Sequence, residues 1–125
     1  MSRTTKDRLL EILNAISAVR SHLNYGGLED LLVWDAVCMR LFQIGEVTKG
    51  LDKKVLATYP GVRHTEVIGL RNVLAHRYYE LEYEMIEDTV KHDLDQLEIV
   101  IRQILADEGT TWQFRSFADL IDASY

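Results

Sequence analysis

The 125-residue sequence contains few of the residues that form disulfides or interrupt helices. Its single cysteine, Cys38, can form no internal disulfide, so nothing in the sequence requires an oxidising compartment. We interpret Cys38 as a small buried hydrophobe. There is one proline, and the seven glycines gather at a few places, a pattern typical of long helices joined by short connections.

The sequence also lacks long apolar runs. No stretch reaches the uninterrupted apolar length of a membrane span. The apolar stretch near the N-terminus is broken by Glu11 and Asn14, which is not typical of a signal peptide. We therefore expect a soluble, cytoplasmic protein with no membrane contact.

Apolar residues recur every three or four positions through most of the chain, which predicts amphipathic helices. We expect four long helices, over about residues 5–23, 28–49, from 64 or 65 through the segment 71–80, and 84–106. A short helical turn is expected before Pro60. The residues form a single domain, 1–125, with a short C-terminal extension at about 109–125. In that extension, Ser116 and Asp119 resemble the capping box of a fifth helix.

No segment shows the alternation expected of a strand, so the predicted class is all-α, an antiparallel bundle of four to five helices. The second of these helices is apolar on nearly all sides. Such a helix is expected to be buried on more than one side.

The net charge of −6 is unfavourable for a protein that binds a polyanion, but the charges are unevenly distributed. Residues 49–77 include six basic and two acidic side chains, whereas residues 80–98 include eight acidic side chains and one lysine. The chain therefore has a basic middle followed by an acidic segment. The acidic segment has a simpler interpretation, that it solvates the outer face of the fourth helix.

The segment RNVLAHRYYE, residues 71–80, combines a permanent cation, an imidazole and two phenols. On a straight helix Arg71 and Tyr78 share a face, Asn72 can reach His76, and Arg71 and His76 diverge. Convergence of Arg71 and His76 would need a bend, a frayed end or a second copy of the chain. A purely structural interpretation is also open: Arg71 pairs with a carboxylate, His76 complements the helix dipole, and the tyrosines pack.

The surrounding sequence gives this segment a more specific interpretation. RNVLAHRY matches the pattern R-x-x-x-x-H-x-Y, and "IGE", "YP", "IGLRN" and "LAH" follow in order along the chain. From the first helix to about Ala106, the chain resembles the HepT-like toxins of the HEPN ribonuclease superfamily. One departure is His64, at a position where relatives often carry tryptophan. The resemblance implies a HEPN-like bundle and the toxin half of a type VII toxin–antitoxin pair, whose partner is a minimal nucleotidyltransferase antitoxin of the MntA type.

The resemblance further implies a metal-independent endoribonuclease. Cleavage of RNA by transesterification needs a base, an acid and a cation that stabilises charge on phosphorus. We assign His76 as general base or acid and Arg71 as the phosphate clamp, and Asn72 either orients His76 or binds the substrate. The single histidine of the motif favours a homodimer with two copies in one cleft. The basic residues expected to contact RNA are Lys49, Lys53, Lys54, Arg63 and Arg77.

No cofactor or metal is expected. The four histidines, His22, His64, His76 and His92, lack the spacing of metal ligands relative to cysteine or carboxylate side chains.

The resemblance implies another role for Tyr78, as the residue that the partner nucleotidyltransferase adenylylates (AMPylates). A nucleotide on this phenol would add negative charge and bulk two residues from His76. Tyr79 is the competing acceptor, and Tyr83 lies outside the motif. We prefer Tyr78 because a continuous helix would place it on the same face as Arg71.

Two other functions remain open at this level. The protein could be a non-catalytic helical module that binds the nucleotidyltransferase and its substrate, or a dimeric bundle with no active site. The presence of Arg71, Asn72 and His76 together favours the ribonuclease, because a binding module does not need that set.

Overall fold

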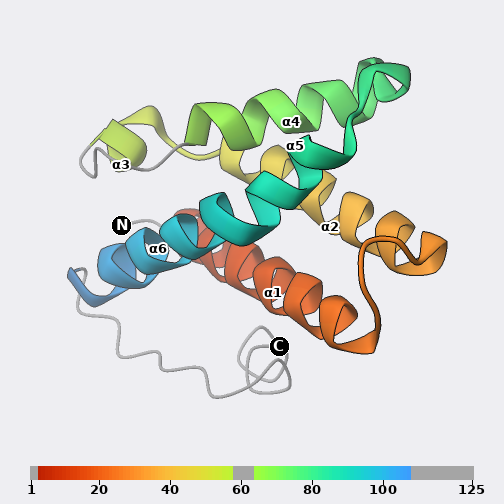
Figure 1. Ribbon diagram of the computed structural model, residues 1–125. Coiled ribbons are helices and arrows are strands. Elements are labelled where there is room, and N and C mark those ends of the chain that lie inside the picture. The colour runs from red at the N-terminus through yellow and green to blue at the C-terminus, as the bar shows by residue number, and fades with distance from the viewer. Residues whose placement is uncertain (1–2, 58–63, 108–125) are drawn as a thin grey trace.

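The structure, a computed structural model, describes residues 3–57 and 64–107 (Figure 1). Its helices are α1 (Arg3–Tyr25), α2 (Leu31–Lys49), α3 (Lys53–Ala57), α4 (His64–His76), α5 (Tyr83–Asp88) and α6 (Leu94–Asp107), with a 3-10 turn at Tyr78–Glu80 and a π-helical turn at Thr89–Asp93. No strand occurs in the two described ranges, which confirms the all-α prediction. Pro60 and the helix expected within 109–125 lie outside the described residues.

Helices α1 and α2 form a hairpin, and the start of α2 is set by an N-terminal cap. The Asp30 carboxylate accepts hydrogen bonds from the backbone N–H groups of Leu32, at 2.9 Å, and Val33, at 3.3 Å. These bonds satisfy donors that have no partner within the helix. The cap explains why α2 begins at Leu31 rather than at the predicted position near Leu28.

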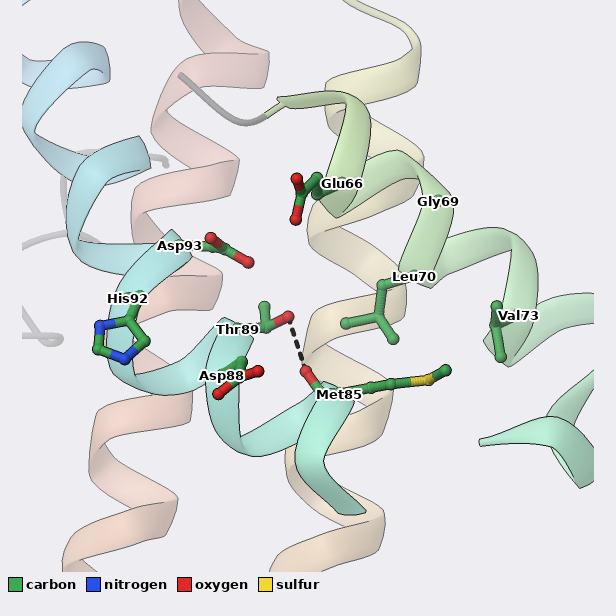
Figure 2. A pocket seen from close by; sticks show the side chains of 9 residues that line it. All are labelled: Glu66, Gly69, Leu70, Val73, Met85, Asp88, Thr89, His92 and Asp93. Carbon is green, nitrogen blue, oxygen red and sulfur yellow. Dashed lines mark hydrogen bonds between the residues drawn. The ribbon is translucent and has the colours of Figure 1, made fainter. Parts of the chain in front are cut away.

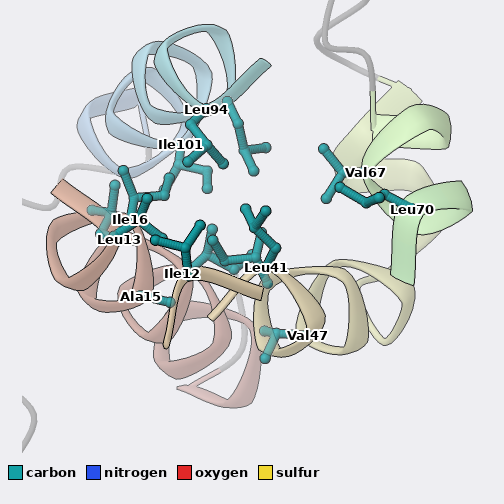
Figure 3. Packing of buried hydrophobic residues seen from close by; sticks show 14 of the residues in the cluster. Ile12, Leu13, Ala15, Ile16, Leu41, Val47, Val67, Leu70, Leu94 and Ile101 are labelled. Atoms are coloured by element: carbon teal, nitrogen blue, oxygen red, sulfur yellow. The ribbon is translucent and has the colours of Figure 1, made fainter. Parts of the chain in front are cut away.

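The hydrophobic core lies where α1, α2, α4 and α6 meet, as Figure 3 shows. The buried faces include Ile12 and Ile16 of α1, Leu41 of α2, Val67 of α4, and Ile101 of α6. Each is at most 4 % exposed, and burying a side chain of this size contributes about 1.5–3 kcal/mol. The apolar faces expected from the periodicity are therefore confirmed. Cys38 is buried, as predicted.

Helix α2 is covered on two sides and bare on a third. It packs against α1 on one side and α4 on the other, which confirms the expectation of burial on more than one side. The remaining face carries Leu32, 74 % exposed, and Met39, 65 % exposed. This chain alone therefore leaves an apolar stripe of α2 in contact with water.

The predicted fourth helix is divided by the π-helical turn between α5 and α6. The Thr89 hydroxyl donates to the backbone carbonyl of Met85, at 3.0 Å. Such a bond competes with the backbone hydrogen bonds of a helix. The apolar periodicity continues across the π-helical turn, so the sequence pattern did not reveal this turn.

Part of the acidic segment holds the bundle together rather than only solvating it. The Arg20 guanidinium of α1 pairs with Asp95, at 2.6 Å, and with Glu98 of α6. Glu98 also accepts from Arg102, at 2.8 Å. Burial acts to raise the pKa of Glu98, but the hydrogen bonds from Arg102 and Arg20 outweigh it and lower that pKa. In the described ranges, no helix combines the length and hydropathy needed to cross a bilayer.

Candidate functional site

Arg71 lies on α4 and its side chain reaches back toward α2. Its Nε donates to the Glu46 carboxylate, and its guanidinium carbon lies 5.4 Å from the centre of the Phe42 ring. The side chain is only 14 % exposed. The guanidinium is thus held by a carboxylate and an aromatic face, so its position is fixed before any ligand binds.

The close approach of α2 and α4 at this point depends on Gly45. A Cβ built on Gly45 would lie 2.3 Å from the Cβ of Arg71 and 3.1 Å from the backbone oxygen of Val67. Only a residue without a side chain fits between the two helices here. The "IGE" segment therefore supplies both the glycine that allows Arg71 to approach α2 and the Glu46 carboxylate that binds its guanidinium.

Asn72 contacts Arg71 directly. Its side-chain oxygen accepts from Nη1 of Arg71, at 2.9 Å. The sequence analysis expected Asn72 to orient His76 or to bind the substrate. The structure shows the Asn72 side-chain oxygen bound to Arg71, and the expected roles of Asn72 toward His76 and the substrate stay predictions.

His76 is the last residue of α4, and it is exposed. Five residues of helix separate it from Arg71, which corresponds to a rise of about 7.5 Å and a rotation of about 140°. The Arg71 side chain contacts α2. Both residues belong to one continuous helix, on which this spacing predicts that their side chains start in different directions.

Tyr78 does not lie on α4, contrary to the prediction of a helix through residues 71–80. Arg77 has non-helical backbone angles, φ −137° and ψ 42°, and Tyr78–Glu80 form a 3-10 turn. Tyr78 instead turns toward α2, where the indole N–H of Trp34 donates to its hydroxyl oxygen, at 3.4 Å. The argument from a shared helix face was therefore wrong.

Tyr78 and Arg71 nevertheless lie next to the same aromatic ring. Tyr78 and Phe42 line one groove between α2 and α4, and the Arg71 guanidinium lies over the Phe42 ring. Tyr78 is 52 % exposed, so about half of this residue remains accessible to solvent.

The competing phenols have different surroundings. Tyr79 is 84 % exposed. Tyr83 stacks on Trp34, with ring centres 5.8 Å apart and an angle of 8° between the planes. Desolvation and then the nearby Glu87 and Glu29 carboxylates raise the pKa of Tyr83, which disfavours its phenolate form.

The basic residues predicted to contact RNA do not gather around His76 in one chain. Lys49 ends α2 and Lys53 and Lys54 begin α3, beside the start of α4, whereas His76 ends α4 (Figure 1). Arg77 follows His76 in the sequence. Its Nη1 lies 3.6 Å from Oε2 of Glu80, with which it forms an ion pair. Arg63 lies outside the described residues, as does the side chain of His64.

The sequence analysis missed a pocket on another side of α4 (Figure 2). It has a volume of about 590 Å³ and is lined by Glu66, Gly69, Leu70, Val73, Met85, Asp88, Thr89, His92 and Asp93. Its three carboxylates carry the same sign of charge as a phosphate backbone, which disfavours RNA as a ligand of this pocket. No group of three or more potential metal ligands occurs among residues 3–57 and 64–107.

Comparison with known proteins places the chain in a family. The sequence profile of the family described as "Ribonuclease HepT-like" matches residues 9–104. "Putative RNase MJ1380" of Methanocaldococcus jannaschii is 27% identical over 71% of this chain and 83% of its own length. "Probable ribonuclease HepT" of Thermococcus cleftensis is 29% identical over 78% of this chain and 92% of its own length.

A further relative, "Putative RNase MJ0125" of Methanocaldococcus jannaschii, is 29% identical over 58% of this chain and 62% of its own length. No solved structure matches the chain significantly. The profile covers most of the chain, including all of α2 and α4 and the R-x-x-x-x-H-x-Y segment. The chain is therefore a member of the HepT-like family of HEPN ribonucleases.

Proposed function

We propose that this protein is a metal-independent endoribonuclease that acts as the toxin of a toxin–antitoxin pair in the cytoplasm. The observation that carries the proposal is the arrangement of α4, which holds a preorganised guanidinium at Arg71 and ends in an exposed imidazole at His76. The names of the relatives, which describe ribonucleases, support the same reaction class.

In the proposed reaction, the 2′-oxygen of a ribose attacks the adjacent phosphorus while the bond from phosphorus to the 5′-oxygen breaks. One imidazole accepts the 2′-hydroxyl proton, and an acid returns a proton to the leaving 5′-oxygen. Arg71 stabilises the charge that develops on the phosphorane oxygens. The products are a 2′,3′-cyclic phosphate and a 5′-hydroxyl, and all atoms come from the RNA.

The proposed active unit is a homodimer. Helical spacing directs Arg71 and His76 of one chain to different sides of α4, which favours a site that a second copy completes. The start of α2 carries two exposed apolar side chains, Leu31 at 71 % and Leu32 at 74 %. In the proposed dimer these side chains pack against their copies, which removes apolar surface from water, and two α4 helices lie along one cleft.

We further propose that a partner nucleotidyltransferase silences the protein by transferring AMP to Tyr78. The phenol is half-exposed, and its oxygen is oriented by Trp34. A nucleotide attached there adds a phosphate close to the groove beside Arg71. That charge competes with the RNA phosphate for the same guanidinium.

The direct test of the ribonuclease proposal is cleavage of RNA by the purified protein in excess EDTA. We expect cleavage to proceed at an unchanged rate, because every proposed catalytic group is a side chain. Products should carry 2′,3′-cyclic phosphate ends, detected by their resistance to a phosphatase that removes only monoesters. Activity that disappears with EDTA and returns with a divalent cation would contradict the proposal. Intact RNA under all conditions would favour the non-catalytic binding module.

A further inference from the structure

A groove between α2 and α4 adjoins the proposed active site and has no role in the chemistry described so far. It has a volume of about 400 Å³ and is lined by Asp35, Cys38, Met39, Phe42, Leu74 and Tyr78. Pockets of this size, with mostly apolar walls and a few polar groups, are typical of sites for small molecules. The carboxylate of Asp35 and the hydroxyl of Tyr78 are its polar groups.

We propose that this groove binds a nucleobase that carries an exocyclic amino group, with Asp35 as the acceptor of that group. The proposal rests on the ribonuclease function proposed above, because it names the substrate feature that the same site recognises.

The walls suit an aromatic heterocycle. Phe42 and Tyr78 offer rings, and Met39 and Leu74 offer apolar surface on which a base can lie. Met39 is 65 % exposed, so covering it with a base removes a large apolar side chain from water. A phosphate would use neither the rings nor the carboxylate, and an aliphatic chain would leave the carboxylate without a hydrogen-bond donor.

The polar group at the groove selects among bases. An ionised carboxylate only accepts hydrogen bonds, so it pairs with the amino groups of adenine, cytosine and guanine. Uracil presents carbonyl oxygens on both sides of its N–H, and these repel a carboxylate. Burial raises the pKa of the Cys38 thiol to about 11, and the negative charge of Asp35 adds to this shift. Because Cys38 and Asp35 both line the groove, the charge of Asp35 acts on groups within it.

The position of the groove relates the base to the reacting phosphate. Phe42 forms part of the groove and also lies under the Arg71 guanidinium. A nucleotide whose base lies in the groove therefore directs its phosphate toward Arg71. The pocket between α4 and α5 has no such cation among its lining residues, which include three carboxylates, so it does not offer an equivalent site.

The base can come from two sources. It can belong to the RNA strand, in which case the groove sets the base preference at the cleavage site. It can also be the adenine of an AMP unit on Tyr78, since Tyr78 lines the groove itself. In the second case the modification fills the groove as well as placing charge beside Arg71.

The methionines provide the test, because the sequence has three and two of them line different pockets. Met39 lines the proposed groove and Met85 lines the pocket between α4 and α5. In the full chain labelled with carbon-13 at the methionine methyl groups, we expect AMP and CMP to shift the Met39 resonance saturably and to leave Met85 in place. UMP should bind about tenfold more weakly. No shift of Met39 with any of the three nucleotides, or equal shifts of Met39 and Met85, would overturn the proposal.

Asp35→Asn isolates the role of the carboxylate, and Asp88→Asn is the matched control with the same change of charge in the other pocket. The first variant should lose the preference for AMP over UMP, because an amide also donates hydrogen bonds. The second should keep it. An equal preference for AMP over UMP in both variants would show that Asp35 does not determine which base binds.

Two further samples separate the sources of the base. A 2′-O-methylated tetranucleotide of adenine, which cannot be cleaved, should shift Met39 at lower concentration than AMP if the RNA strand supplies the base. A chain adenylylated on Tyr78 should show the shifted Met39 resonance without added nucleotide if the AMP unit supplies it. Absence of both effects would reject the groove as a site for either source.

The same measurements separate this proposal from the proposed ribonuclease function. A Met39 shift in a protein that leaves RNA intact would support base binding in the groove and contradict the ribonuclease function. Cleavage of RNA without a Met39 shift would support the ribonuclease function and contradict base binding in the groove.

Discussion

Replacing His76 with alanine is expected to lower the rate of RNA cleavage by roughly 100- to 10,000-fold, the range that a positioned acid or base contributes. The imidazole is the side chain that we assign to proton transfer, whereas the guanidinium is assigned to stabilising charge on the phosphate. The side chain is exposed at the end of α4, so its removal leaves the core intact. Cleavage of a labelled RNA, together with the helical signal in circular dichroism, measures both effects.

His92→Ala is the matched control, because His92 is also exposed but lines the pocket between α4 and α5. We expect this variant to cleave RNA at the rate of the unmodified protein. Full activity in His76→Ala, or an equal loss in both variants, would remove His76 from the mechanism.

Replacing Tyr78 with phenylalanine is expected to abolish the transfer of AMP by the partner nucleotidyltransferase, and with it the silencing of the toxin. The change removes only the phenolic oxygen, which is the proposed acceptor and the atom that Trp34 contacts. The ring that lines the groove is retained, so RNA cleavage should persist. Incubation with the partner and ATP, followed by mass spectrometry of the intact chain, should show no added AMP units.

Tyr79→Phe is the matched control at the neighbouring, more exposed phenol. This variant should accept AMP as the unmodified protein does, and fragmentation should place the adduct on Tyr78. An adduct on Tyr79 or Tyr83, with normal silencing of Tyr78→Phe, would assign the modification to another phenol.

Much of the fold could be predicted from the sequence because helix periodicity records which side chains are buried. Ile12 and Ile16 of α1 are four residues apart, as helical spacing requires, and both lie in the core. The π-helical turn at Thr89–Asp93 could not be predicted, because the apolar spacing continues through it unchanged. Periodicity reports burial, whereas local hydrogen bonds decide where a helix bends or ends.

The chemistry of the candidate site was only partly visible in the sequence. The pattern R-x-x-x-x-H identifies the residues but not their neighbours, which come from α2. Glu46 and Phe42, which hold Arg71, lie more than twenty residues earlier in the chain. The contact between Trp34 and Tyr78 likewise joins α2 to the end of the motif. Such contacts depend on how α2 and α4 pack, which local spacing does not encode.

The central claim is that two chains together form one active site. It predicts that Arg71→Ala and His76→Ala proteins are each inactive, because each lacks one required group in both copies. A mixed dimer retains one intact Arg71 and one intact His76, contributed by different chains.

The measurement that tests this most directly is RNA cleavage by the two inactive variants after they are mixed, unfolded together and refolded. We predict that a readily measured part of the activity returns in the mixture, while each variant refolded alone stays inactive. A mixture that remains inactive, although tagged copies of the two variants purify together as a dimer, would contradict the shared site.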